Sequence, residues 1–219
     1  MATPRQTVLS NSLTTTIGST VQHNGLIVFF NSYESSGAPS VTSVKLGTTS
    51  LSLAVSKVLN SGGENAIYIY YLPDIPAAQT SVVIAGTNLD VSLNSGGVCV
   101  YEVPGILTTS PFDKSNSGSA TTGTTASSGA TPTPWGQPNE FVVGGASMFN
   151  NIVPPSSGGW TNSDDSGLVW ACGYKNVTDG SAQTYTTAST SSNPWIAAIA
   201  TFKLKAANQG AFMPFIARR

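Results

Sequence analysis

Short apolar runs of strand length recur along the chain, separated by segments rich in Gly, Pro, Ser and Asn. Residues 41–46 and 51–55 alternate apolar with polar side chains, which places one face of a strand in a core and the other in water. Other runs, such as residues 25–30, are apolar throughout. The predicted strands cover residues 25–30, 41–46, 51–55, 66–71, 81–84, 97–103, 141–146, 168–174, 182–187 and 195–203. The pattern therefore predicts an all-β chain of about ten strands.

The run at residues 195–203 is the one place where periodicity alone also fits a helix. A strand is favoured because Pro194 precedes the run, the run is short, and β-branched and aromatic residues occur in it. Strands at this spacing, separated by turns, indicate an antiparallel β-sandwich that is jelly-roll-like. A β-helix or a propeller would need a repeat of fixed period, which the sequence does not display.

Four segments follow from this pattern. Residues 1–24 are predicted to form an N-terminal arm or edge strand, residues 25–205 a single β-sandwich domain, and residues 206–219 a C-terminal docking tail. Residues 107–138 are rich in Ser, Thr, Gly and Pro, and a loop of that length is unusual inside a domain. An interdomain linker, a poorly patterned edge strand and a segment lying across a neighbouring subunit are all possible. An irregular strand plus a loop on the same domain is favoured, because strands resume directly afterwards.

Charge is scarce in this chain. Charged residues make up 9% of the 219 residues, whereas about 25% is usual, and the formal net charge is −1. Without a basic stripe, the sequence argues against a nucleic-acid partner. The longest apolar run near the start is too short to cross a bilayer, so membrane insertion is not expected, and no secretory signal is evident. A virion location reconciles a surface-type composition with the absence of an export signal; an extracellular or cell-surface location is the alternative.

No catalytic constellation is evident, and we expect no enzymatic activity. Glu102 is the only acid well inside a predicted strand, whereas Asp90 and Glu140 fall in turns or at strand ends and are expected to be solvated. His23 is the only histidine, and no Gly-x-Ser-x-Gly elbow accompanies it. We expect no cofactor.

The two cysteines, Cys99 and Cys172, both lie in apolar predicted strands. They are expected to be buried thiols that act as small apolar residues. A disulfide between them stays open, because the sequence does not reveal the geometry that a disulfide requires.

Calcium is the most credible ion, with Asp164 and Asp165 as weak candidate ligands in an Asn- and Asp-rich loop. Such loops also arise because Asn and Asp suit turns, so the signal is weak. Asn176-Val-Thr178 fits the N-glycosylation pattern, although a bacterial-type chain would leave it bare.

Glycans are possible partners, because sugar-binding modules stack sugars on exposed aromatic rings. The candidate rings are Trp160, Trp135 and Tyr185, with Trp160 in a Gly-rich turn as the first choice. Trp170 and Trp195 lie in apolar strand context and are expected to belong to the core.

The C-terminal tail combines apolar and basic side chains, which would be a liability if exposed on a monomer. The predicted assembly contacts are Phe212, Met213, Phe215, Ile216, Arg218 and Arg219.

Several short motifs spread over residues 25–204 carry a resemblance. They are Val41-Thr-Ser-Val-Lys-Leu-Gly47, Val100-Tyr-Glu-Val-Pro-Gly105, Asn139-Glu-Phe-Val-Val-Gly-Gly-Ala146 and Asn193-Pro-Trp-Ile-Ala-Ala-Ile-Ala-Thr-Phe-Lys203. Together they resemble a poorly characterised, jelly-roll-like β-sandwich module of phage virion proteins and bacterial surface proteins. The resemblance implies a setting on particles or surfaces and supplies no catalytic residues.

The expected function is therefore that of a virion structural protein, which decorates or is attached to a phage capsid or tail through its termini and long loop. Its expected partners are other virion proteins or copies of itself. A carbohydrate-binding adhesin module and an extracellular filament subunit are the alternatives.

Overall fold

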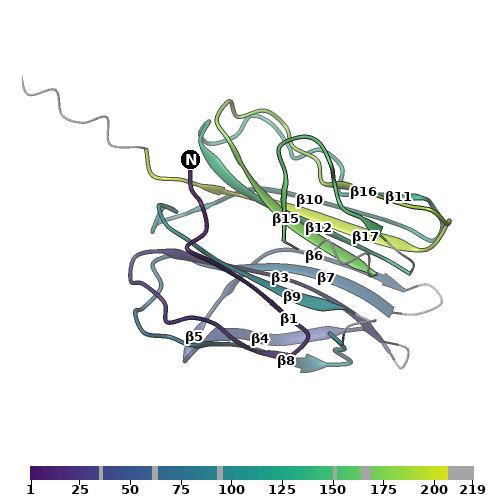
Figure 1. Ribbon diagram of the computed structural model, residues 1–219, viewed down its shortest axis with the longest axis horizontal. Coiled ribbons are helices and arrows are strands. Elements are labelled where there is room, and N and C mark those ends of the chain that lie inside the picture. The colour runs from purple at the N-terminus through teal and green to yellow at the C-terminus, as the bar shows by residue number, and fades with distance from the viewer. Residues whose placement is uncertain (35–36, 61–63, 93–95, 150–151, 164–168, 207–219) are drawn as a thin grey trace, which may run out of the picture.

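The computed structural model describes residues 1–34, 37–60, 64–92, 96–149, 152–163 and 169–206. In this part of the chain, seventeen strands form four antiparallel sheets and there is no helix, so no helix that could cross a membrane (Figure 1). The expected all-β antiparallel sandwich fold is confirmed.

Two sheets come from the N-terminal half of the chain. The inner N sheet has the order β1 (Gln6–Ser10), β9 (Gly97–Val103), β3 (Gly25–Glu34), β7 (Glu64–Leu72), β6 (Ser52–Asn60). The outer N sheet has the order β2 (Thr14–Thr16), β8 (Ser81–Thr87), β4 (Ser40–Leu46), β5 (Thr49–Ser50).

The other two sheets come from the C-terminal half. The inner C sheet has the order β10 (Phe112–Ala120), β17 (Trp195–Lys203), β12 (Glu140–Met148), β15 (Trp170–Val177), β14 (Thr161–Asn162). The outer C sheet has the order β11 (Thr125–Ser127), β16 (Thr186–Ser189), β13 (Ile152–Val153).

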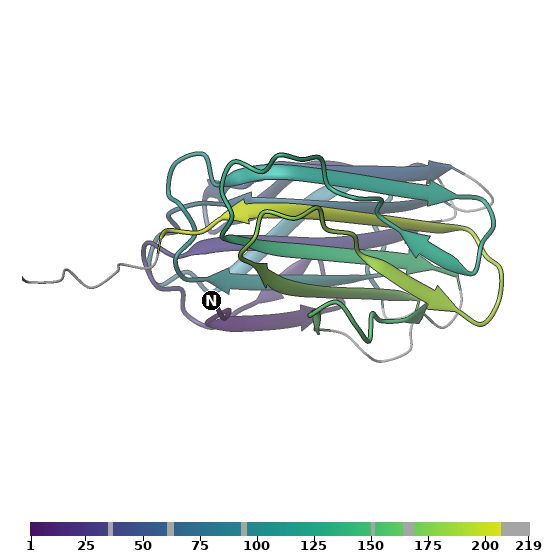
Figure 2. The same ribbon diagram turned by 90° about the horizontal axis from the view of Figure 1, so that it is seen from above.

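The four sheets stack as layers, with the two inner sheets facing each other in the middle (Figure 1). Figure 2, seen from above, shows the C-terminal half lying over the N-terminal half. Three apolar clusters fill the spaces between the layers: one between the inner sheets and one beneath each outer sheet. Strand β3 illustrates the consequence. Its Ile27 and Phe29 belong to the central cluster, whereas Leu26, Val28 and Phe30 face the outer N sheet. The continuously apolar strands are therefore those buried on both faces.

The two halves of the chain have the same connectivity. In each half, the first and last long strands pair at one side of the inner sheet, and the middle strands follow in the same spatial order: β1-β9-β3-β7-β6 matches β10-β17-β12-β15-β14, and β2-β8-β4 matches β11-β16-β13. Each half thus has a jelly-roll connectivity in which the chain alternates between two sheets. The residues expected to form one sandwich of about ten strands form two such units that share a core.

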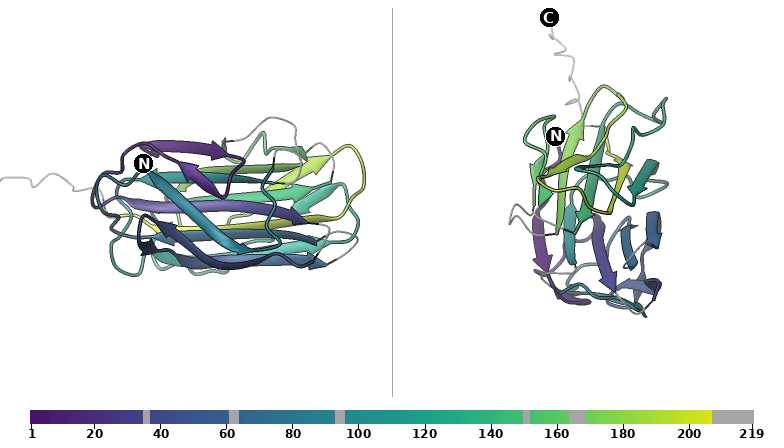
Figure 3. Two further views of the ribbon diagram at one scale, coloured as in Figure 1. Left: turned by 90° about the horizontal axis from the view of Figure 1, so that it is seen from below. Right: turned by 90° about the vertical axis from the view of Figure 1, so that its right-hand side faces the viewer.

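The inner sheets pack with their strands in opposite order, so the two halves are related by an approximate two-fold axis. Strand β6 contacts β10, β7 contacts β17, and β3 contacts β12. On the other side of the axis, Tyr101 of β9 meets Tyr174 of β15 with ring centroids 5.6 Å apart. The lower face of this stack is visible in Figure 3.

Residues 107–138 hold two strands, β10 and β11. Strand β10 forms the edge of the inner C sheet beside β17, with an irregular register between Phe112 and Ser115. All nine residues of β10 are half-buried, which is why its sequence shows no alternation between apolar and polar positions.

Residues 1–24 are held to the sandwich by one buried carboxylate. Glu102 of β9 is fully buried and accepts hydrogen bonds from the Arg5 guanidinium, the Gln6 side chain, the Val21 amide and the Asn24 side chain. Burial alone would raise the pKa of Glu102, but these four donors outweigh it and hold the pKa below its usual value. The carboxylate therefore joins strand β1 and the following loop to the inner N sheet.

An aromatic ring of one inner sheet lies directly on a glycine of the other. The Phe29 ring occupies the space that a Cβ atom on Gly145 would need, and the Ala171 carbonyl oxygen would lie 2.9 Å from that atom. Gly145 therefore permits the contact between β3 and β12.

Replacing Gly145 with Ala should lower the free energy of unfolding by ~1–3 kcal/mol, because the added methyl group overlaps the Phe29 ring. Phe29→Leu removes the ring atoms concerned, so the double variant should lose less than the sum of the two single losses, by at least ~1 kcal/mol. Urea denaturation of the four proteins measures this coupling. Additivity within ~0.5 kcal/mol would contradict the proposed overlap.

Candidate functional site

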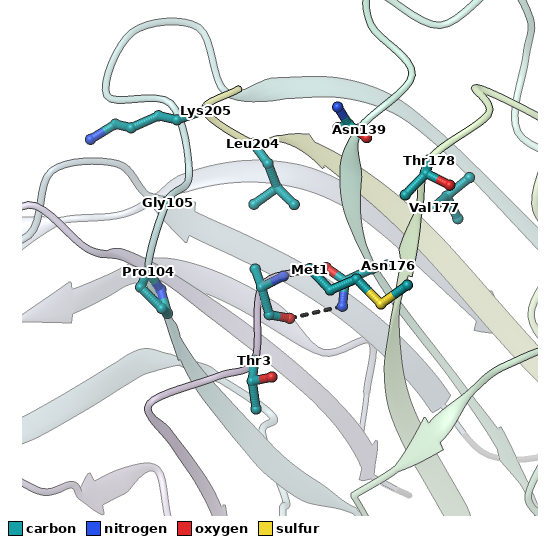
Figure 4. Close-up of a pocket in the computed structure, with 11 residues that line it drawn as sticks. Met1, Thr3, Pro104, Gly105, Asn139, Asn176, Val177, Thr178, Leu204 and Lys205 are labelled. Carbon is teal, nitrogen blue, oxygen red and sulfur yellow. Dashed lines mark hydrogen bonds between the residues drawn. The ribbon is translucent and has the colours of Figure 1, made fainter. Parts of the chain in front are cut away.

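A pocket of about 370 Å³ lies where the chain enters and leaves the sandwich (Figure 4). Its wall includes Ala2, Gly105 after β9, Asn139 before β12, Asn176 near the end of β15, and Leu204 after β17. The pocket therefore lies at one end of both inner sheets, and we call it the chain-end pocket.

Hydrogen bonds fix residues 2 and 205 at this pocket. The Ala2 amide donates to Asn176 Oδ1 at 3.0 Å, and Asn176 Nδ2 donates to the Ala2 carbonyl at 2.8 Å. The Lys205 amide donates to the Gly105 carbonyl at 2.6 Å. The first residues and residue 205 are thereby held beside the junction between the two halves. The Asn176 side chain of the glycosylation motif is occupied by the Ala2 backbone.

The chemistry of the pocket suits a peptide segment. Leu204 and Val177 provide apolar surface, Asn139 and Asn176 provide amide groups, and Lys205 provides a positive charge. Apolar contact together with a few amide donors and acceptors is how grooves bind extended chains.

A second candidate surface surrounds Trp160, which precedes β14. The Trp160 ring is half-buried: its neighbour Tyr185 meets it edge to face with centroids 4.8 Å apart, and Lys175 Nζ lies 4.6 Å from its centroid. A shallow pocket of about 210 Å³ adjoins the ring, with Gln183 and Thr184 among its lining residues. Burial lowers the pKa of Lys175, partly offset by the charge of Asp179.

Trp160 is the one of the three predicted sugar-stacking rings that lies at the surface. Tyr185 is fully buried beneath the outer C sheet, and Trp135 is 9% exposed and donates from its Nε1 to Thr131 at 3.3 Å. Tyr185 and Trp135 are therefore buried in this structure and pack in the cluster beneath the outer C sheet. The ring of Trp195, expected in the core, is half-buried.

Other predicted site residues are not placed. Asp164 and Asp165, the calcium candidates, and the assembly residues Phe212, Met213, Phe215, Ile216, Arg218 and Arg219 lie outside the described residues. Within the described residues, no group of three or more His, Cys, Asp or Glu side chains is arranged to hold a metal ion. His23 lies at the surface with its Nδ1 2.6 Å from Asp74 Oδ1.

A buried pair of carboxyl groups was not expected from the sequence. Glu140, which we expected to be solvated, is fully buried at the start of β12 beside Asp113 and the Thr201 hydroxyl, and no N–H group in the described part of the chain satisfies its oxygens. Burial raises the pKa of Glu140 to about 8; Asp113 reinforces this, whereas Thr201 and Lys203 oppose it. The expectation of solvation is therefore wrong for Glu140, because β12 lies inside its sheet between β17 and β15 and the Glu140 side chain lies beside Asp113 and Thr201.

Asp113 is the ionised partner of this pair. It accepts a hydrogen bond from the Gly136 amide at 2.6 Å and lies 3.7 Å from Lys203 Nζ. Burial would raise the pKa of Asp113, but the Gly136 amide, Glu140 and two lysines together lower it. A protonated Glu140 beside an ionised Asp113 avoids placing two negative charges together.

Searches of protein-family models, curated proteins and solved structures found no match to this chain.

Replacing Glu140 with Gln should make stability less sensitive to pH. Because the folded-state pKa of about 8 exceeds the ordinary value of 4.5, wild-type stability should fall as pH rises between these values. The Gln variant should match the wild type near pH 5 and exceed it in melting temperature by several degrees near pH 9, since each pKa unit corresponds to ~1.4 kcal/mol. Thermal melts across this range measure the difference.

Glu102→Gln is the matched control, because the stability that depends on Glu102 should change with pH in the opposite direction. The pKa of Glu102 is lowered in the folded protein, so its stabilising effect is present above its ordinary pKa and is lost as pH falls through the folded-state pKa. This variant should be less stable than the wild type at neutral pH and approach it in acid. A constant difference between Glu140→Gln and the wild type at every pH would contradict the buried protonated state.

Proposed function

We propose that this chain is a non-enzymatic structural protein of a phage virion, attached to a capsid or tail through its chain ends. The observation that carries the proposal is the convergence of residue 2, residue 205 and the junction between the halves on one pocket. Residues 2 and 205 lie side by side there, so segments that adjoin them can hold the subunit at one place, with the rest of its surface turned outward.

The architecture supports the same proposal. Jelly rolls are frequent in viral capsid proteins and in lectins, so the fold is compatible with a virion role and also with a carbohydrate-binding role. The scarcity of charge in the sequence permits close packing of subunits, because little repulsion opposes it. Extended terminal segments are a common means of holding such subunits in an assembly.

The apolar tail is proposed to make the attachment. Phe212→Ser combined with Phe215→Ser should abolish the self-association or particle attachment of the full chain and leave its melting temperature within about 2 °C, because the proposal assigns both side chains to the attachment and not to the stability of the sandwich. Sedimentation velocity over a range of protein concentrations, together with electron microscopy of the material, measures this. Electron microscopy also separates a filament subunit from a particle component.

Val58→Ser is the matched control. Val58 is an exposed apolar residue on the edge strand β6, 38% accessible, and pairs with Ala66 away from the chain-end pocket. This variant should assemble as the wild type does. A full chain that stays a monomer at every concentration, with both ends open to protease and no association with particles, would contradict the proposal.

A carbohydrate-binding role is the second candidate, and the half-exposed Trp160 ring beside Lys175 and Gln183 favours it. If the chain binds glycans there, Trp160→Ala should weaken binding at least about tenfold, because an aromatic stacking contact is lost. A glycan array followed by calorimetry on any glycan that binds measures the effect. Trp135→Phe, which changes a buried ring, should bind as the wild type does, and a blank array would remove this candidate.

A further inference from the structure

The two cysteine sulfurs meet in the centre of the molecule. Cys99 of β9 and Cys172 of β15 are fully buried on the facing sides of the two inner sheets, and their Sγ atoms are 2.7 Å apart with no disulfide joining them. Heavy atoms that are not bonded settle at about 3.5–4.0 Å, whereas a disulfide bond is about 2.05 Å long. The fold therefore holds the sulfurs closer than two thiols prefer and within a small displacement of bonding distance.

The strand register explains why the sulfurs meet here. Cys99 pairs with Phe29 of β3, and Cys172 pairs with Gly145 of β12. Because the Phe29 ring lies directly on Gly145, the neighbouring strands bring the two cysteines face to face. The proximity is thus built into the backbone of both halves and does not depend on a loop.

A chain of hydrogen bonds leads from the sulfurs toward the surface. The Cys99 thiol donates to the Tyr101 hydroxyl at 3.2 Å, which lies 3.4 Å from Cys172 Sγ and 2.9 Å from the hydroxyl of the half-buried Ser163. Burial raises the pKa of Tyr101 well above its usual value, with the neighbouring cysteines adding to the effect, so its hydroxyl stays neutral. A neutral hydroxyl can accept a proton from a thiol on one side and donate one to Ser163 on the other.

We propose that Cys99 and Cys172 form an oxidation site, at which a small peroxide converts the two thiols into a disulfide that links the two halves of the chain. The fully buried position favours an oxidant of the size of hydrogen peroxide over a larger disulfide reagent. The proposal rests on the sulfur geometry and stands independently of the virion function.

The step balances with one peroxide molecule. One thiol sulfur attacks a peroxide oxygen while its proton passes through the Tyr101 and Ser163 hydroxyls to the leaving hydroxide; the O–O bond breaks, a sulfenic acid forms, and the hydroxide becomes water. The second sulfur attacks the sulfenic sulfur and gives its proton to the leaving hydroxide; the S–O bond breaks, and the S–S bond forms as a second water leaves. Two thiols are oxidised, and one hydrogen peroxide is reduced to two water molecules.

The bond would join positions 73 residues apart in the chain and fasten one inner sheet to the other. A link of that span restricts the unfolded chain strongly and should raise the melting temperature by roughly 5–15 °C. A protein made in a reducing cytoplasm would acquire this stabilisation only on reaching oxidising surroundings.

The test compares the full chain before and after oxidation. Protein reduced with dithiothreitol, freed of reductant and treated with one equivalent of hydrogen peroxide should lose two hydrogens in intact mass and show no titratable thiol after denaturation. Its melting temperature should rise, and dithiothreitol should reverse every change. Two thiols that remain titratable, or a mass that increases by oxygen atoms, would overturn the proposal.

Two variants separate the disulfide from other effects of peroxide. Cys99→Ser nearly keeps the side-chain volume and should show no rise in melting temperature on oxidation. If this variant does not fold, the comparison of reduced and oxidised wild type still shows whether the disulfide forms. Tyr101→Phe keeps the ring and removes the hydroxyl, and should slow disulfide formation at least about tenfold without preventing it. An unchanged rate in Tyr101→Phe would overturn the role of the hydroxyl as a proton relay.

Discussion

The structure depends on two sheets that are each buried on both faces. Strands β3 and β9 lie between the outer N sheet and the inner C sheet, and β12 and β17 lie between the outer C sheet and the inner N sheet. A side chain at the centre of these strands is shielded from bulk water, so it is apolar, has its polar atoms bonded, or loses its charge. Glu102 is bonded by four donors, and burial raises the pKa of Glu140 to about 8, which favours its neutral form.

This constraint accounts for what the sequence revealed of the fold. The runs at residues 25–30 and 141–146 are apolar throughout, and the run at 195–203 is mostly apolar, because both of their faces are covered; all three were predicted as strands. The alternating run at residues 41–46 corresponds to β4 in an outer sheet, where one face meets solvent. Alternation does not by itself separate inner from outer strands, since the alternating run at residues 51–55 falls in β6 at the edge of an inner sheet, and the four layers could not be derived from the pattern alone.

The strand number was underestimated for two physical reasons. Strands such as β5, β13 and β14 are two residues long, too short to show a period, and β10 lies at a half-buried edge where small polar residues suffice. The common topology of the two halves left no repeat in the sequence, because a fold constrains strand order and burial more than residue identity.

The candidate site residues were harder to predict, because their burial depends on contacts between segments that are distant in sequence. Glu140 looked like a solvated acid at the end of a strand, and Tyr185 looked like a possible surface ring between polar residues. Glu140 lies beside Asp113 and Thr201, and Tyr185 packs with Val142 and Ile199, so the residues that bury both are distant in sequence and local patterns carry no information about them. The burial of Cys99 and Cys172 could be predicted from their apolar context. Their proximity could not be predicted, because it requires β9 and β15 to face each other from two different sheets.

The position of the chain-end pocket follows from topology. Within each half, the first inner strand runs antiparallel to the last: β1 pairs with β9, and β10 pairs with β17. Each half therefore begins and ends at one side, and the short connection from residue 104 to residue 111 brings those two places together. Because the connectivity is the same in both halves and the connection between them is short, residues 2, 104 and 205 lie side by side. The convergence on which the proposed attachment rests is thus a consequence of how the two halves are joined.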